Sequence, residues 1–291
     1  MYREITSTSC RRVTCGIFNV VERPNRRNSN MDFAETYDSV LVPVIFQPWA
    51  RELIRRVPPR DGMRFLDLAC GTGAATREVL ATGVSPTAMT GVDMAAGMLD
   101  VARAKTRAAS VEVNWIEADA AKLPFPDDQF DTAYCQQALQ FFPDRAQALK
   151  ELRRVLVGGA SVAFCVTTGL EENPLLRSQA DALERHVDEA AGAAVRAICS
   201  LSDTEEIRAL FEDAGFEDVE VDRVSLTLSH PDGRVYAAGA MGGMHTGDKI
   251  AGMPREAVDA CFDDFLAGLG ECFDGVGIEF PHVANVVVAR A

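Results

Sequence analysis

The sequence predicts an α/β fold in which helices cover both faces of a mostly parallel, doubly wound sheet of seven strands. Short apolar runs alternate with helical patterns between residues 63 and 166, which implies parallel strands joined by right-handed crossovers. The first of these runs leads into a glycine-rich turn before a helix. The 291 residues are 47% hydrophobic, which is enough to bury a substantial core.

Five of the expected strands belong to this alternating region. The first is short and mostly apolar, as a buried parallel strand should be, whereas residues 111–119 alternate apolar and polar side chains, which favours a place near the sheet edge. The segments between are rich in strong helix formers, and the last is closed by Gly158 and Gly159. We expect strands at residues 63–69, 87–93, 111–119, 130–135 and 160–166, and helices at 73–81, 95–109 and 144–156.

The N-terminal part divides into two segments of different composition. Residues 1–30 contain six arginines and two glutamates, which predicts a disordered basic extension, with a transit peptide as the alternative. A helical pattern begins at residue 31 and should form a cap over the sheet. Because proline lacks an N–H and crowds the preceding turn, Pro43 and Pro48 predict that this helix is broken into two pieces.

The pattern changes after Thr168. We expect a long polar helix at about residues 174–198, then a helix with a capping box of Ser202 and Glu205 that ends at Gly215 before a strand. Residues 229–254 carry six glycines without a clear period, which predicts a mobile loop or lid. A helix at about 255–273 and a strand at 282–291 follow. Residues 31–291 should therefore form a single domain, with insertions at about 170–200 and 229–275.

The composition excludes several classes of function. The chain has 29 basic and 43 acidic residues, a formal net charge of -14, which opposes binding to nucleic acid. Its eight cysteines show no CxxC pair or zinc-ligand spacing, so we expect reduced thiols and no metal site. No apolar run reaches the length of about 18 residues that a membrane span requires. A cytoplasmic protein is expected, and a homodimer is compatible with the sequence.

The stretch FLDLACGTGAATREV, residues 65–79, places Gly71 and Gly73 between a strand and a helix. Bare backbone at this point lets a ligand approach closely, and the helix N-terminus favours negative charge. Thr76 replaces the third glycine of the dinucleotide fingerprint, which counts against NAD and FAD, and the lysine of a nucleoside triphosphate loop is absent. Taken alone, the loop is also compatible with a tight turn that binds nothing.

Two aspartates follow the next two predicted strands. Asp93 ends the second strand, 20 positions after Gly73, where a carboxylate can accept hydrogen bonds from both hydroxyls of a ribose. Asp119 ends the third strand, where a carboxylate can accept from the exocyclic amine of adenine. Because the carboxyl ends of parallel strands share one edge of the sheet, the sequence predicts a nucleoside site there.

Successive motifs of the chain resemble one known family from about residue 31 to residue 166, and the later segment LSDTEEIRALFEDAGF fits the same pattern. By these motifs the chain is similar to the class I S-adenosyl-L-methionine-dependent methyltransferases, in the branch near the quinone-biosynthesis C-methyltransferases and related small-molecule methyltransferases. The motifs are LDLACGTG, GVDMAAGML, EADAAKLPFPDDQFD, CQQALQFFPD and ELRRVLVGGASVAF.

The resemblance implies S-adenosyl-L-methionine as cofactor, S-adenosylhomocysteine as product, and roles for ten residues. The methionine end would be held by Asp67 and the backbone of Ala69, Gly71 and Gly73. The ribose and one adenine face would be held by Asp93 and Met94, and the adenine edge by Asp119 and Ala120. Gln136 would lie beside the sulfonium, and Tyr37 would close over the cofactor.

The segment after the fourth strand bears on the acceptor. Methyltransferases of nucleobase amines resemble one another in an Asp/Asn-Pro-Pro-aromatic run here, whereas this chain has Cys135-Gln136-Gln137-Ala138. With the acidic net charge, this favours transfer to an oxygen or carbon of a small molecule, such as a phenolic, quinone-like or polyketide-like acceptor. Two alternatives remain open: an enzyme of the same fold with other chemistry, and a cofactor-binding protein without catalysis.

Histidine is the usual general base, and the chain has four. His245 lies in the glycine-rich region most exposed to a substrate, with Met241 and Met244 beside it, and is the candidate catalytic base; a loop histidine without a role is the alternative. His282 follows Pro281 near the last strand and is expected to be structural. The side chains expected to shape an aromatic pocket are Phe46, Trp49, Phe141 and Phe142.

Overall fold

The computed structural model describes residues 33–109, 111–242 and 246–291. The strands are β1 (Arg64–Leu68), β2 (Ala88–Asp93), β3 (Val113–Glu117), β4 (Phe130–Gln136), β5 (Leu156–Thr167), β6 (Glu217–His230) and β7 (Ile278–Arg290). They form one seven-stranded sheet in the order β3-β2-β1-β4-β5-β7-β6. The first five strands pair in parallel, and β7 lies antiparallel between β5 and β6. The predicted fold class is confirmed.

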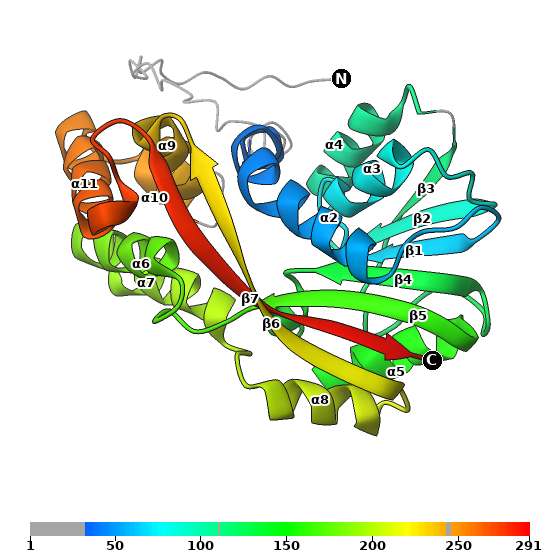
Figure 1. The fold of residues 1–291 in the computed structure, drawn as a ribbon. Helices are drawn as coiled ribbons and strands as arrows, with labels where there is room; N and C mark the ends of the chain where they lie inside the picture. The colour runs from blue at the N-terminus through cyan, green and yellow to red at the C-terminus, as the bar shows by residue number, and fades with distance from the viewer. Residues whose placement is uncertain (1–32, 110, 243–245) are drawn as a thin grey trace, which may run out of the picture.

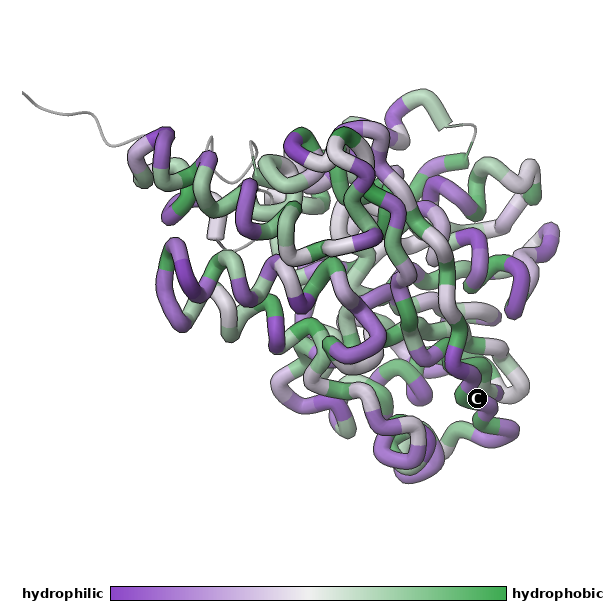
Figure 2. The backbone as a smooth tube through the Cα atoms, turned by 60° about the vertical axis from the view of Figure 1, so that its left-hand side comes forward, coloured by the Kyte–Doolittle hydropathy of each residue, from purple (hydrophilic) through white to green (hydrophobic). Residues whose placement is uncertain are grey.

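Helices cover both faces of this sheet (Figure 1). One face carries α2 (Gln47–Arg56), α3 (Ala74–Ala81) and α4 (Ala96–Thr106), and the other carries α5 (Arg145–Val155) and α8 (Thr204–Asp213). Side chains alternate across a strand, so Phe65 packs into one core and its neighbour Leu66 into the other. Figure 2 shows hydrophilic and hydrophobic residues alternating along the peripheral helices, as amphipathic packing requires. The order of strands reverses between β1 and β4, which opens a ligand crevice at their carboxyl ends.

The N-terminal helix is continuous, contrary to the predicted break. Residues 33–36 are helical and lead into η1, a π-helix (Tyr37–Phe46), which passes directly into α2. Pro43 lies inside η1, where the wider π turn accommodates its ring, and Pro48 lies in the first turn of α2. The prediction failed because it assumed α-helical hydrogen bonding throughout.

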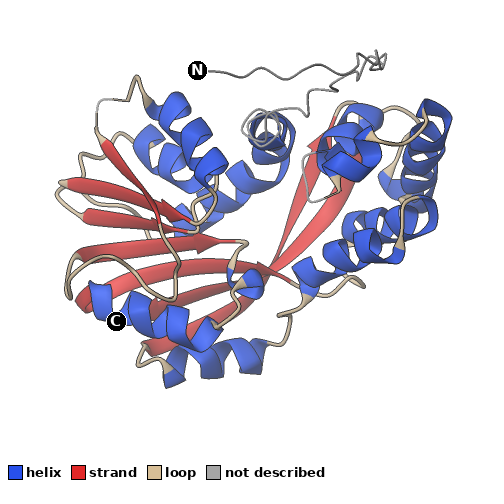
Figure 3. Ribbon diagram, turned by 180° about the vertical axis from the view of Figure 1, so that it is seen from behind, coloured by secondary structure: helices blue, strands red, loops and turns tan. Residues whose placement is uncertain are grey.

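A helical lobe stands beside the sheet on a two-stranded ribbon. Beyond the last pairing of β5, residues 225–230 of β6 and 278–283 of β7 continue as a pair and reach the lobe (Figures 1 and 3). The lobe consists of α6 (Pro174–His186), α7 (Glu189–Arg196), α9 (Gly233–Gly242), α10 (Gly247–Ala251) and α11 (Arg255–Gly268). Among the residues that the structure describes, no helix is long and apolar enough to cross a bilayer.

The glycine-rich segment is another correction, because most of it forms α9 and α10 rather than a loop. Its glycines allow close packing. A Cβ on Gly239 would lie 2.4 Å from a methyl group of Val40 on η1, so the missing side chain lets α9 contact the N-terminal helix. Residues 243–245 lie outside the described residues, as does the predicted basic extension of residues 1–30.

Three helix boundaries also differ from expectation. The helix expected at 174–198 is divided near Val187, where the side chain of Asp188 accepts from the backbone N–H of Ala191 and starts α7. At the start of α8 the cap is Asp203, not Ser202, because its carboxylate accepts from two backbone N–H groups. Gly158 and Gly159 do not end α5 but lie inside β5, because α5 passes directly into β5. The pairing of β5 with β4 is irregular at this point.

Candidate active site

The loop after β1 has left-handed backbone at Ala69, Gly71 and Gly73, with φ of 54°, 54° and 78°. The two glycines meet different surroundings. A Cβ on Gly71 would have no atom within 4 Å, whereas one on Gly73 would lie 2.5 Å from the indole of Trp115. Gly71 therefore borders open space where a ligand could lie, and Gly73 makes room for a packed side chain.

Asp67, at the end of β1, connects this strand to the first turn of α3 by hydrogen bonds. Its Oδ2 accepts from the backbone N–H of Thr76 at 3.0 Å and from the Thr76 hydroxyl at 2.7 Å. Burial raises the pKa of Asp67 from 3.8 to about 6, although the bonds from Thr76 lower it. Thr76, which replaces the third glycine of a dinucleotide loop, therefore has a structural task that glycine could not perform.

Asp93, at the end of β2, is joined to the same loop. Its Oδ2 accepts from the N–H of Gly71 at 2.8 Å, and its Oδ1 accepts from the N–H of Ala95 at 2.8 Å. Burial raises the pKa of Asp93, and the backbone bonds oppose that shift. The next residue, Met94, is 73% exposed, which is unusual for a large apolar side chain and leaves it accessible to a flat ligand.

Asp119 and Ala120 lie beyond the end of β3, next to this region but outside both cavities described below. The backbone N–H of Ala118 donates to the carbonyl of Asp93 at 3.1 Å, so the ends of β2 and β3 are held together. Asp119 is exposed, and its Oδ1 accepts from the N–H of Ala121 at 2.9 Å. The predicted adenine edge is therefore adjacent to the predicted ribose site.

The η1 helix covers the loop. Tyr37 and Phe46 contact each other on this helix, with ring centroids 4.9 Å apart. Burial, followed by the carboxylates of Asp93 and Asp38, raises the pKa of Tyr37 well above its ordinary value, so the phenol is neutral. The side-chain amide of Gln136 donates to the backbone carbonyl of Phe46 and ties the end of β4 to the same helix.

A small cavity of about 30 Å³ lies under η1 and brings together five of the ten residues predicted to bind the cofactor. These five are Tyr37, Asp67, Ala69, Gly71 and Gln136. Phe46 completes this wall, and Cys70, Thr72, Ala74 and Ala75 supply the rest of the lining. Side chains and backbone from β1, β4 and η1 thus meet at one point, whereas the residues predicted at the ends of β2 and β3 do not line this cavity.

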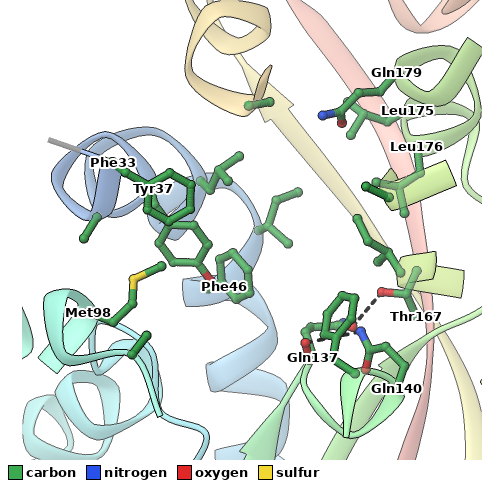
Figure 4. Close-up of a pocket in the computed structure, with 18 of the residues that line it drawn as sticks. Phe33, Tyr37, Phe46, Met98, Gln137, Gln140, Thr167, Leu175, Leu176 and Gln179 are labelled. Atoms are coloured by element: carbon green, nitrogen blue, oxygen red, sulfur yellow. Dashed lines mark hydrogen bonds between the residues drawn. The ribbon is translucent and has the colours of Figure 1, made fainter. Parts of the chain in front are cut away.

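A larger cavity of about 460 Å³ lies between η1 and the helical lobe (Figure 4). Tyr37 and Phe46 line both cavities, so this aromatic pair separates them. The wall on the lobe side comes from α6, α7 and α9, and residues 95–98 bring it to the end of β2. None of its described lining residues is Asp, Glu, Lys or Arg.

The predicted aromatic and histidine residues are distributed differently from expectation. Phe46 and Phe141 line the large cavity, but Phe142 does not, and Trp49 is fully buried. The indole N–H of Trp49 donates to Nδ1 of His282 at 3.0 Å. His282 also lines the cavity, and burial lowers its pKa to about 4, so the ring is neutral near pH 7 with its proton on Nε2.

His245 and Met244 lie outside the described residues. Met241 was expected to line a pocket beside them but is fully buried in the core instead, in contact with Cys261. The preceding turns of α9 do reach the large cavity through Tyr236 and Ala240.

The sequence analysis missed four polar residues of the large cavity, Gln137, Gln140, Thr167 and Gln179. Gln137 has a positive φ of 53° directly after β4, and Gln137 and Gln140 are buried. The signal was present in the run CQQALQFF, where glutamines recur in an apolar segment next to the predicted crevice. Only the fold shows that they point into a cavity.

Comparisons with known proteins agree with this geometry. A family model described as "Methyltransferase domain" matches residues 66–164. Demethylmenaquinone methyltransferase of Staphylococcus aureus is 32% identical over 186 residues, which cover 60% of this chain and 76% of that protein. The chain belongs to the class I S-adenosyl-L-methionine-dependent methyltransferases. Its cofactor is accordingly S-adenosyl-L-methionine.

Solved structures show the same fold at lower identity. The YcgJ protein of Bacillus subtilis gives a TM-score of 0.56 at 22% identity, over 83% of this chain and 97% of that one. Phosphoethanolamine N-methyltransferase 2 of Haemonchus contortus, solved with S-adenosyl-L-methionine, gives 0.54 at 19% identity, over 84% of this chain and 52% of that one. These identities establish a common architecture and leave the acceptor to be argued from the cavity.

Proposed function

We propose that this methyltransferase transfers the methyl group to an oxygen or carbon of a small apolar acceptor of the phenolic, quinone-like or polyketide-like kind. The observation that carries the proposal is the cavity of about 460 Å³ that shares Tyr37 and Phe46 with the glycine loop. Its volume suits a drug-sized ligand. An ammonium or phosphate acceptor would need a charged partner, and the described lining supplies none. The Staphylococcus aureus relative is named for a quinone.

The cofactor roles that the sequence suggested remain our proposal for this site. The open space at Gly71 fits close approach of the amino-acid end, and the neighbouring carboxylate of Asp93 fits ribose hydroxyls. Met94 would lie on one adenine face, and Asp119 with Ala120 at its edge. Tyr37 is a neutral donor above the loop, and Gln136 would lie beside the sulfonium.

The bound cofactor supplies an electrophilic methyl group on a sulfonium. The protein has to align the acceptor in line with that methyl group and exclude water. Tyr37 and Phe46 line both cavities and would contribute to this alignment. Because positive charge disperses during transfer, a buried apolar site without fixed cations favours the reaction.

The described lining offers no base of ordinary strength, because His282 is neutral and its Nδ1 already accepts from Trp49. We therefore propose an acceptor whose nucleophile is itself acidic, such as a phenol or hydroquinone. His245 remains the proposed general base for this proton. Its replacement by Gln should lower kcat more than tenfold if it acts so, since general-base catalysis contributes about a hundredfold or more.

The test is a panel of acceptors in the presence of S-adenosyl-L-methionine, with S-adenosylhomocysteine and the methylated product measured by mass spectrometry. Phenols and hydroquinones should yield S-adenosylhomocysteine only when the acceptor is present. Phosphoethanolamine and aliphatic amines serve as comparison acceptors. Turnover with the amines and none with the phenols or hydroquinones would refute the proposal.

A further inference from the structure

We propose that Gln137 and Gln140 recognise the polar edge of the acceptor, one as hydrogen-bond donor and the other as acceptor. Gln137 is 8% exposed and Gln140 is 4% exposed, and both line the large cavity. Nε2 of Gln137 and Oε1 of Gln140 are buried without a hydrogen-bond partner among the described residues. Buried polar atoms are rarely left unpaired, so two in one cavity indicate a ligand that pairs them.

Gln137 is held in place by its other amide atom. Oε1 accepts from the Thr167 hydroxyl at 2.6 Å, and the backbone N–H donates to the carbonyl of Cys165 at 2.9 Å, so β5 fixes the residue twice (Figure 4). Its φ of 53° is costly for a residue with a side chain. Such strain concentrates at functional positions, and here it falls on a residue that lines the cavity.

Gln140 is held by the nitrogen of its side-chain amide instead of the oxygen. Its Nε2 donates to the backbone carbonyl of Gln137 at 3.2 Å, and the backbone carbonyl of Gln140 accepts from the Arg145 guanidinium at 3.0 Å. A carbonyl can only accept, so the amide orientation of Gln140 is fixed and Oε1 is the atom left over. Gln137 and Gln140 therefore bring one unpaired donor and one unpaired acceptor to the wall of the cavity; Gln140 lies in the short helix at Leu139–Phe141, and Gln137 lies just before it.

The matching ligand is an uncharged, largely apolar ring compound with both a carbonyl oxygen and a hydroxyl group. The carbonyl would accept from Gln137, and the hydroxyl would donate to Gln140. This inference rests on the proposed function and narrows it, because a phenol without a carbonyl would leave Nε2 of Gln137 unpaired. Discrimination of this kind is strong in buried sites, since a missing partner costs the desolvation of the group that remains.

The experiment measures binding by calorimetry, in the presence of S-adenosylhomocysteine, of four related bicyclic probes: hydroxytetralone, tetralone, tetrahydronaphthol and tetralin. Wild-type protein should bind hydroxytetralone most tightly and tetralin least. Gln137→Met should weaken the two carbonyl probes roughly five- to tenfold and leave tetrahydronaphthol unchanged. Gln140→Met should weaken the two hydroxyl probes by a similar factor and leave tetralone unchanged.

Gln147→Met on α5 is the matched control, because Gln147 is exposed and outside both cavities. If Gln137→Met does not fold, Gln137→Glu keeps the acceptor for Thr167 and replaces the amide donor with a carboxylate oxygen, so it should likewise weaken the carbonyl probes. Equal losses for all four probes, the reversed pairing, or no binding of any probe to wild type would overturn the inference. S-adenosylhomocysteine titrated alone, and turnover with other acceptors, test the proposed function separately.

Discussion

Gly71 shows what a single missing side chain contributes to this enzyme. A Cβ there would enter open space, so Val at this position should obstruct the cofactor without disturbing the core. We expect Gly71→Val to reduce affinity for S-adenosylhomocysteine at least tenfold in calorimetry. The positive φ of 54° also costs about 2 kcal/mol in the free energy of unfolding.

The control for this strain is Gly83→Val at the C-terminal end of α3. Gly83 shares the left-handed backbone, with φ of 83°, and a Cβ there also meets nothing within 4 Å. It should lose similar stability in urea unfolding while binding S-adenosylhomocysteine normally. Equal binding by both variants would contradict the placement of the cofactor at Gly71.

Asp93 gives a second prediction at the residue scale. Removal of its carboxylate by Asp93→Ala should weaken S-adenosylhomocysteine binding by about 1 to 3 kcal/mol, the value of charge-assisted hydrogen bonds. Because Asp93 also accepts from Gly71, part of the loss could come from the loop itself. A deoxyribose analogue of the ligand separates the two contributions. It should lose less affinity than S-adenosylhomocysteine; equal losses would remove the ribose contact from the explanation.

Asp67 makes the stability of the protein depend on pH. Its pKa is raised by burial from 3.8 to about 6, so the folded protein favours the protonated form. The stabilising contribution is therefore complete below pH 3.8 and is lost as the pH rises through about 6. The shift corresponds to about 3 kcal/mol.

The uncharged variant Asp67→Asn keeps an oxygen for Thr76 and has no such dependence. Relative to this variant, wild-type protein should lose up to about 3 kcal/mol of unfolding free energy between about pH 4 and pH 7. Urea denaturation at several pH values measures the difference. A constant difference across that range would show that Asp67 is not the titrating group.

At the element scale, η1 is fixed over the loop by a buried carboxylate. Asp38 is 6% exposed and forms ion pairs with Arg77 of α3 at 2.7 Å and Lys105 of α4 at 3.0 Å. We expect Asp38→Ala to lower the free energy of unfolding by about 1 to 3 kcal/mol and to speed hydrogen exchange in residues 33–46. Cofactor dissociation should become faster, because Tyr37 is carried by the same helix.

The exposed pair of Asp100 and Arg103 is the control for this experiment. Asp100→Ala removes an ion pair on α4 whose side chains are about half exposed, and should change stability by about 0.5 kcal/mol or less. A comparable effect of the two substitutions would mean that η1 is held by its apolar face and not by Asp38.

The elements that the sequence predicted well are those with a local signal. Strands β1, β2, β4 and β5 have short apolar runs, β3 alternates apolar and polar residues, and the loop at Gly71 has a glycine pattern tied to its backbone conformation. The continuous helix through Pro43 could not be predicted, because π-helical hydrogen bonding has no residue signature. The helices at residues 233–251 were missed for a related reason. Position 239 requires glycine because α9 packs there against Val40, which is almost 200 positions away in the chain.

At the scale of the whole molecule, two cavities built from distant segments share one aromatic wall. The proposed cofactor side comes from the first half of the sheet, and the proposed acceptor side adds the helical lobe on β6 and β7. The ribbon and α9 bring this lobe against η1, which supports our proposal that residues 31–291 act as a single domain. Binding at one cavity should therefore affect the other through Tyr37 and Phe46.

The two tryptophans of the chain can report on the two cavities separately. Trp115 packs beneath Gly73 at the loop, and Trp49 donates to His282 at the large cavity. In Trp49→Phe protein, S-adenosylhomocysteine should change the emission of Trp115, whereas hydroxytetralone should have little effect. In Trp115→Phe protein the dominant response should come from hydroxytetralone. Responses of both ligands through the same tryptophan would place them in one cavity and contradict the proposed division of cofactor and acceptor sites.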